Sequence, residues 1–345
     1  MTNPTAERVS LPGLSSTAFV HPADQAALSA LRKVPALDLI LRKLIGFIGE
    51  RSVRLVYLAS AVKVGEHQFP RLNTIYQECL ETLGVEERPE LYVSQTPFVN
   101  AGAVGVDEPF IVLNSGTLSL MSEEQIRFIL GHELGHIICD HVLYKTMLGI
   151  LVNLSAFRLG IPLTGLALFA VVAALSEWDR KSELTCDRSG LLCVQNPEVA
   201  YESFMKMAGG GKVDDMSLAT FVAQAEEYES YGDHLDGVFK LLNLVGRRHP
   251  FFVLRLAELK RWAEGGDYEK ILTGDYARRG DAEPTVYQSI AQSAESYKAS
   301  ASESRDPLIG FLRDLGTSVG EKGSSLWGSV RGRFSRKDGE EPGEG

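Results

Sequence analysis

The chain has 345 residues, of which 44% are hydrophobic and 23% are charged. This composition is typical of a folded globular protein and excludes a mainly disordered chain, a collagen-like repeat and a polytopic membrane protein. Lys and Arg total 35 against 45 Asp and Glu, which gives a net charge of −10. That acidic balance argues against a nucleic-acid partner, because nucleic-acid-binding proteins normally present a basic face.

The first residues and the cysteines indicate the compartment. Residues 1–16 lack the basic start and the apolar run of a secretory signal peptide, so we expect a protein that is not secreted. The four cysteines, Cys79, Cys139, Cys186 and Cys193, include no CxxC pair. We therefore expect reduced thiols and a cytoplasmic location.

The first elements can be predicted from hydrophobic periodicity. Residues 1–20 read as a flexible lead, and a helical pattern follows over residues 22–51. Residues 53–65 resemble a strand, residues 71–83 an amphipathic helix, and residues 91–95 another strand.

The middle of the chain combines a hairpin with several helices. Two short apolar runs flank residues 107–109, which is a hairpin signal. Residues 122–125 form a capping box, which predicts the start of a helix that continues to about Val142. We expect a second helix at about residues 178–194, and two or three more before Trp262.

These elements predict an α+β, mostly helical fold. We place one domain at residues 21–265, with an apolar helical block at 147–176 between two of its helices. From Glu264 the composition becomes polar and Gly-rich, so we expect residues 266–345 to be a largely flexible C-terminal extension.

A short motif carries most of the chemical information. Residues 132–136 read His-Glu-Leu-Gly-His. On a helix His132 and His136 share one face, so both imidazoles can reach one metal ion. Glu133 is displaced by about 100° and could take a proton from a zinc-bound water, whose pKa the metal lowers to about 7. The alternative is a helix face with two unrelated histidines, but burying three polar groups in such an apolar helix without a shared purpose is costly.

The third ligand decides the class of site. An extended HExxHxxGxxH motif needs Gly at position 139 and His at position 142, where this chain has Cys139 and Val142. His141 is one position off and points to another face. A structural zinc site normally has four protein ligands, and no fourth is evident unless Cys139 or Cys186 serves.

A glutamate from a second helix is the other common solution. The downstream candidates are Glu177, Glu183 and Glu198, and Glu183 stands out because Asp187 follows one turn later. Asp187 could then accept the free N–H of a ligating histidine. By spacing alone, an acidic face exposed to solvent is an equally good interpretation.

The HELGH motif, followed about fifty residues later by Glu183-x-x-x-Asp187, resembles the HtpX-like and CAAX-prenyl-endopeptidase family of zinc metallopeptidases, a gluzincin group. Asn100-Ala101 with residues 110–113 resembles the substrate-holding edge strand of that family. His249-Pro250 with Arg255 resembles its downstream His-Pro…Arg element. The likeness extends from about Leu91 to Trp262. It implies a zincin-type domain with a motif helix, a second ligand helix and a small sheet bearing the substrate edge.

The resemblance also implies residue roles. His132, His136 and Glu183 would bind one zinc ion, Glu133 would be general base and acid, and His249 would stabilise the oxyanion. Asp187 and Arg255 would support the ligands from behind. An extended substrate would add as a strand to the following residues: Asn100, Ala101, Phe110, Ile111, Val112 and Leu113.

Two segments raise the question of a membrane. Residues 147–176 are apolar but too short for two crossings, and one crossing would separate Glu183 from His132. We expect a helical hairpin that packs on the domain or dips into a membrane surface. Residues 325–337 mix aromatic and basic side chains and could contact an anionic membrane, although a solvated tail is the more ordinary interpretation.

The sequence therefore predicts a zinc endopeptidase that acts on polypeptides. By family analogy we expect a role in protein quality control in the cytoplasm, with contact to the inner face of the cell membrane as an option. The rivals are a processing protease dedicated to one partner, and a chaperone or adaptor without activity on a retained protease fold. An intact Glu133 argues against the last, because a binding module needs no general base.

Overall fold

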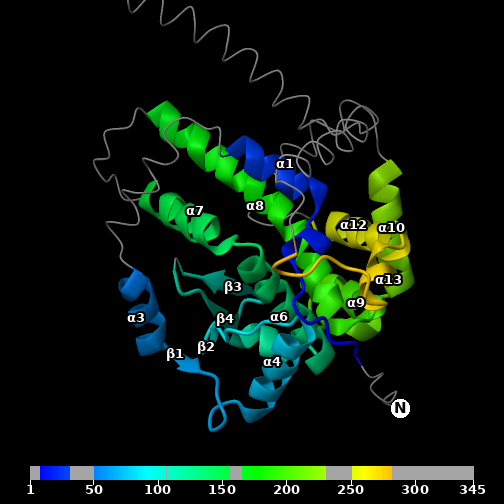
Figure 1. Ribbon diagram of the computed structural model, residues 1–345, viewed down its shortest axis with the longest axis horizontal. Coiled ribbons are helices and arrows are strands. Elements are labelled where there is room, and N and C mark those ends of the chain that lie inside the picture. Colours follow the sequence, from blue (N-terminus) through cyan, green and yellow to red (C-terminus); the bar gives the residue numbers. More distant parts are fainter. Residues whose placement is uncertain (1–7, 32–49, 106, 156–164, 231–250, 282–345) are drawn as a thin grey trace, which may run out of the picture. The chain divides into compact units, whose positions relative to one another are not determined.

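The computed structural model describes residues 8–31, 50–105, 107–155, 165–230 and 251–281 (Figure 1). All of these residues belong to one of the two units into which the chain divides. The helices are η1 (Ser16–Ala18), α1 (Pro22–Leu31), α3 (Glu50–Ser60), α4 (Pro70–Thr82), α5 (Ser115–Leu120), α6 (Glu123–Ile138), α7 (Val142–Ser155), α8 (Gly165–Val194), α9 (Pro197–Gly209), η2 (Val213–Asp215), α10 (Leu218–Ser230), α12 (Phe252–Glu264) and α13 (Asp267–Leu272). The strands are β1 (Ala61–Lys63), β2 (Glu90–Ser94), β3 (Ala101–Val104) and β4 (Phe110–Asn114). The described part is thus mostly helical with a small sheet, which confirms the predicted fold class.

Most predicted elements are confirmed, and residues 53–65 are the main exception. They form the C-terminal part of α3 and then β1, whereas the sequence predicted one strand. The side chain of Tyr57 packs edge-on against Phe110 of the sheet, while Leu55 and Leu58 are exposed. A short apolar run alone does not distinguish a strand from a helix.

The sheet has the order β1-β2-β4-β3. β4 pairs parallel with β2 and antiparallel with β3, so it is an inner strand. The expectation that residues 110–113 form the substrate edge is therefore wrong. Their Phe-Ile-Val-Leu run is buried throughout, as expected of an inner strand with both faces covered. The edge next to α6 is β3, which begins at Ala101.

The two faces of the sheet pack against different helices. Leu91, Val93, Ile111 and Leu113 belong to the large core that also contains residues of α4 and α6. The alternating residues Tyr92, Phe110 and Val112 form a smaller cluster with Tyr57 of α3. This arrangement fixes α6 against one face of the sheet.

The ends of the described region pack together. Leu11, Leu14 and Phe19 lie fully buried in the main core, so residues 8–20 are not the flexible lead that the composition predicted. The start of the predicted extension is also packed, because α13 adds Tyr268 and Ile271 to the same core. Residues 282–345, including the aromatic and basic stretch at 325–337, lie outside the described residues.

The apolar block at 147–176 supplies a second core. Residues of α7 and α8 pack against each other and against the end of α1 (Figure 1). This cluster consists of Leu31, Met147, Leu148, Leu151, Val171, Leu175 and Trp178. None of the helices within the described ranges combines the length and the apolar character needed to cross a membrane.

Glycines allow α6 and α8 to approach closely. A Cβ atom on Gly131 would lie 2.3 Å from Cβ of Cys193, and one on Gly135 would lie 2.7 Å from Cβ of Ser189. The Ser189 hydroxyl also donates a hydrogen bond to the carbonyl oxygen of Gly131 at 2.9 Å. Both glycines belong to the segment that carries the motif. The backbone of the motif helix therefore packs directly against α8 at these two positions.

We predict that Gly131→Ala destabilises the protein by about 1–3 kcal/mol, because the added methyl group overpacks a rigid helix contact. Gly149→Ala in α7 is the matched control, because a Cβ there would meet no atom within 4 Å. Alanine should stabilise that helix by about 0.5–1 kcal/mol. Urea unfolding measures both free energies, and equal stability of Gly131→Ala and the wild type would contradict the close approach.

Candidate active site

The motif side chains lie on the buried helix α6. Ser122 caps this helix, with the reciprocal capping box to Gln125 in place as predicted. His132, Glu133 and His136 are all buried, and the two imidazole rings lie 5.0 Å apart between centroids. The one-turn spacing therefore brings both rings to the same place.

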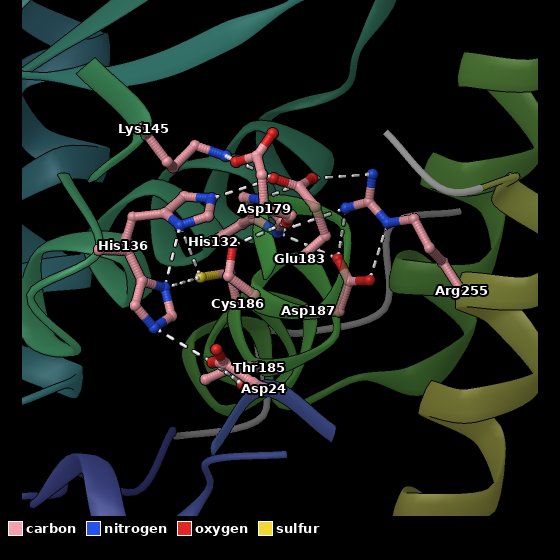
Figure 2. A network of polar contacts seen from close by, with 12 residues as sticks. Asp24, His132, His136, Lys145, Asp179, Glu183, Thr185, Cys186, Asp187 and Arg255 are labelled. Carbon is pink, nitrogen blue, oxygen red and sulfur yellow. Dashed lines mark hydrogen bonds and ion pairs between the residues drawn. The ribbon is translucent and has the colours of Figure 1, made fainter. Parts of the chain in front are cut away.

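Helix α8 brings Glu183 to these two histidines (Figure 2). Oε2 of Glu183 lies 3.5 Å from Nε2 of His132, and its Oε1 lies 3.3 Å from Nε2 of His136. Glu177 instead pairs with Arg180, and Glu198 lies in the first turn of α9. Of the three candidate glutamates, only Glu183 points toward the histidine pair.

Asp187 and Arg255 support this group from behind, as Figure 2 shows. Oδ1 of Asp187 lies 3.0 Å from Nδ1 of His132, and the guanidinium of Arg255 donates its Nε hydrogen to Oδ2 of Asp187 at 2.8 Å. Nη1 of Arg255 also lies 3.4 Å from Oε2 of Glu183. With Nδ1–H of His132 donated to Asp187, Nε2 is the nitrogen that faces Glu183 and that would offer its lone pair to a metal ion.

Lys145 and Asp179, which the sequence did not single out, complete the charge balance of the site. Nζ of Lys145 donates to Oε1 of Glu183 at 2.7 Å and to Oδ1 of Asp179 at 2.8 Å. A buried carboxylate needs such a partner, because transfer of an unpaired charge from water is costly. A signal was present in the sequence, since Asp179, Glu183 and Asp187 recur every four residues on one face of α8.

Glu133 differs from the other acids of the site. Its Oε2 atom is buried and has no hydrogen-bond partner within the described part of the chain, while the carboxyl group accepts a hydrogen bond from the backbone of Ala103 on β3. Burial raises the pKa of Glu133 above its usual value. An unpaired oxygen on a carboxyl group of raised pKa is suited to accept a proton.

The surroundings shift the pKa values of His132 and His136 in opposite directions. Burial alone would lower the pKa of His132, but its hydrogen bonds with Asp187 and Glu183 raise that pKa to about 9. Burial and the charge of Lys145 hold the pKa of His136 well below its usual value. Without an ion, His132 therefore carries a proton that a metal would displace.

A pocket opens beside His132, Glu133 and Glu183. Asn100 and Ala101 line it next to His132, Glu133, Glu183 and Arg255. Its remaining lining is mainly apolar and consists of Val99, Thr117, Phe128, Ile129, Met207 and Phe252. The other predicted substrate residues, 110–113, do not line this pocket.

The donor set fits a metal ion. The ligand atoms of His132, His136 and Glu183 lie within 4.8 Å of one another, and their two nitrogens and one carboxylate are a known set for catalytic zinc. The sulfur of Cys186 lies on the other side of His136, 3.1 Å from Nδ1, so it does not complete this set. His249 lies outside the described residues, and its predicted role is not addressed by this geometry.

Comparisons with known proteins agree with this site. Residues 66–263 match the model of peptidase family M48. The Plastoglobule-localized metallopeptidase 48, chloroplastic, of Arabidopsis thaliana is 32% identical over 265 residues, which cover 75% of this chain and 76% of that protein. The Protease HtpX homolog of Kineococcus radiotolerans is 34% identical over 90 residues, 26% of this chain and 30% of that protein. The Helicobacter pylori homolog is 29% identical over 86 residues, 24% and 28% of the two chains.

No solved structure is significantly similar to the chain. The family match nevertheless covers more than half of its length and includes all of the histidine, glutamate and aspartate positions described above. M48 peptidases are metal-dependent and act on polypeptides, and the predicted resemblance is thereby confirmed. The chain is a metalloprotease that belongs to peptidase family M48.

Proposed function

We propose that this chain is a zinc-dependent endopeptidase in which Glu133 is the general base and acid. The observation that carries the proposal is the convergence of His132, His136 and Glu183 on one point beside the unpartnered Oε2 of Glu133. Zinc suits the two-nitrogen, one-carboxylate set, and three protein ligands leave a coordination position for water. The reaction would then be hydrolysis of a peptide bond without a covalent enzyme intermediate.

Each residue has a defined task in this proposal. A zinc ion held by these residues would supply a water of lowered pKa and would polarise the scissile carbonyl. Glu133 takes one proton from the attacking water at Oε2 and later delivers it to the leaving amine. Asp187, held by Arg255, keeps Nε2 of His132 free for the ion. His249 stays our predicted donor to the oxyanion, as the family resemblance implies.

The substrate would bind next to β3 in this proposal. The outer edge of that strand is partly used already, because Ala103 bonds to Glu133 and the N–H of Gly105 donates to Oγ1 of Thr146 at 3.1 Å. The Asn100–Ala101 end is the part of this strand region that lines the pocket. An extended polypeptide would enter there, with main-chain pairing for affinity and the apolar pocket for selectivity.

The wider role also remains a proposal. We keep protein quality control, a cytoplasmic location without secretion, and the absence of a nucleic-acid partner as predictions. Contact with a membrane surface through residues 147–176 or 325–337 also remains a prediction. The relative from Arabidopsis is named for plastoglobules of the chloroplast, and that location describes that protein.

We predict that Glu133→Gln lowers the kcat for casein or peptide cleavage by about 10²–10⁴-fold, the usual contribution of a general acid–base group. Zinc content, measured by elemental analysis, should stay at one ion per chain because Glu133 is not a ligand. Glu183→Gln should lose the zinc, and Glu177→Gln, a matched change on the same helix, should keep both zinc and activity. Full activity in Glu133→Gln would refute the mechanism.

We predict that zinc affinity rises with pH up to about 9. Below that pH His132 is protonated in the ion-free protein, so each bound zinc displaces a proton. The apparent affinity, measured by chelator competition, should increase about tenfold per pH unit between about pH 7 and 9. Asp187→Asn removes a carboxylate that raises the pKa of His132 and should flatten this dependence. An affinity independent of pH in the wild type would contradict the electrostatics of the site.

We predict a preference for an apolar side chain next to the scissile bond, because Ile129, Met207 and Phe252 line the pocket beside the ligands. Peptides with Leu or Phe at that position should have a kcat/KM at least about tenfold above that of matched peptides with Ser or Asp. Met207→Glu should reduce this ratio without loss of zinc. Equal cleavage of all four peptides would show that the pocket does not select the substrate.

A further inference from the structure

A buried polar chain lies behind His136, on the side away from Glu183. Nδ1 of His136 lies 3.3 Å from Nδ1 of His141 and 3.1 Å from Sγ of Cys186. Nε2 of His141 in turn lies 3.1 Å from Oδ2 of Asp24. Asp24, His141 and Cys186 are all almost fully buried, and the metalloprotease chemistry above uses none of them.

Local backbone geometry places His141 there. Helix α6 ends at Ile138, and Asp140 then adopts the left-handed conformation with φ 56°. This turn reverses the chain, so the N–H of His141 donates to the carbonyl oxygen of His136 at 2.9 Å and the two rings meet at 5.5 Å. Helical extrapolation from the motif placed His141 on another face, because it could not include this turn.

Asp24 reaches the site from the N-terminal helix α1. Its Oδ2 accepts a hydrogen bond from Oγ1 of Thr185 at 2.6 Å (Figure 2). Oγ1 of Thr185 also accepts a hydrogen bond from the N–H of His21 at 3.0 Å, and Arg188 donates to the carbonyl oxygen of Phe19 at 3.2 Å. One contact thus holds the Asp24 carboxylate on α8, and two backbone contacts hold the segment around the start of α1 on the same helix.

These contacts determine which ring nitrogen of His141 and of His136 carries the hydrogen. A carboxylate only accepts, so Nε2 of His141 carries the hydrogen toward Asp24 and Nδ1 of His141 keeps a lone pair. That lone pair faces Nδ1 of His136 and favours a hydrogen on it. Nε2 of His136, which faces Glu183, is then the nitrogen with the free lone pair.

We propose that Asp24 and His141 are positioning residues that hold His136 in its metal-binding tautomer and orientation. His132 has its carboxylate, Asp187, in direct contact, whereas His136 reaches its carboxylate through His141. Asp24 lies outside residues 66–263, which match the family model, so the N-terminal segment contributes to the site. This inference rests on the proposed binding of zinc by His132, His136 and Glu183.

The same atoms could suggest a second ion, because His136, His141 and Cys186 also bring three ligand atoms within 4.8 Å. The proposed tautomer excludes this. A nitrogen that carries a hydrogen has no lone pair for a metal, so Nδ1 of His136 cannot ligate an ion while it keeps that hydrogen. The protein should therefore bind one zinc ion per chain, and this triad is a hydrogen-bonded support.

The test uses the full chain with His141→Phe, which keeps a ring but removes the acceptor, and Asp24→Asn, which keeps the shape but removes the charge. Glu258→Gln is the matched control, because Glu258 contacts His21 at the start of α1, at 3.4 Å, without reaching a ligand. We measure zinc affinity by chelator competition, the absorption spectrum of the Co²⁺-substituted protein, and the thermal midpoint of the ion-free protein.

We expect zinc to bind about 10–100-fold more weakly to His141→Phe, the usual effect of losing a group behind a ligating histidine, and more weakly to Asp24→Asn by a smaller factor. The Co²⁺ bands should shift in both variants. His141→Asn, which restores an acceptor near the Nδ1 position, should recover part of the affinity. Glu258→Gln should match the wild type in affinity and spectrum.

Several results would overturn the proposal. These are unchanged affinity and spectrum in His141→Phe, an equal loss in Glu258→Gln, or two zinc ions per wild-type chain. If His141→Phe does not fold, Asp24→Asn decides by the same two readouts. Failure of the proposed function would look different, because wild type and Glu183→Gln would then bind zinc equally.

Discussion

The site depends on the contacts that the buried carboxylate of Glu183 makes with its neighbours. This carboxylate comes from α8 and contacts histidines of α6, Lys145 of α7 and Arg255 of α12. Such a charge is tolerated in the interior only when it is paired on several sides. The lysine and the arginine provide that pairing without an ion, and a metal would add to it. One side chain thus ties four helices to one point.

The close contact of α6 with α8 makes this geometry possible. Gly131 and Gly135 leave no room for a Cβ atom, and the first directly precedes the motif while the second lies within it. A wider helix separation would move Glu183 away from both histidines, because the carboxylate now lies only 3.3–3.5 Å from their Nε2 atoms. The glycine within the HELGH motif is therefore explained by packing as well as by its place in a catalytic pattern.

Features that depend on local sequence could be predicted. The one-turn spacing of His132 and His136 follows from helix geometry, as does the capping box at Ser122. The separation of Glu183 and Asp187 by one turn left a solvent-exposed acidic face as an equally good interpretation, and in the structure both carboxylates lie beside His132. The helical hairpin expected at 147–176 is consistent with the packing of α7 on α8.

Features that depend on tertiary contacts could not be predicted from the sequence. The apolar run in helix α3 does not distinguish a helix from a strand, and its contact with Phe110 is not visible in the sequence. The inner position of β4 depends on which strands flank it, and a hydrophobic run does not contain that information. Lys145, Asp24 and His141 meet the site only after α7 and α1 have packed on α8. The buried polar network was therefore the least predictable part of the site.

The central claim is that His132, His136 and Glu183 hold one zinc ion. The most direct measurement is an anomalous difference map from crystals of the zinc-loaded protein, recorded at the zinc absorption edge. We predict one peak per chain, within about 2.0–2.2 Å of Nε2 of His132, Nε2 of His136 and a carboxylate oxygen of Glu183. A map without a peak at this position, or with its peak between His136, His141 and Cys186, would contradict the account.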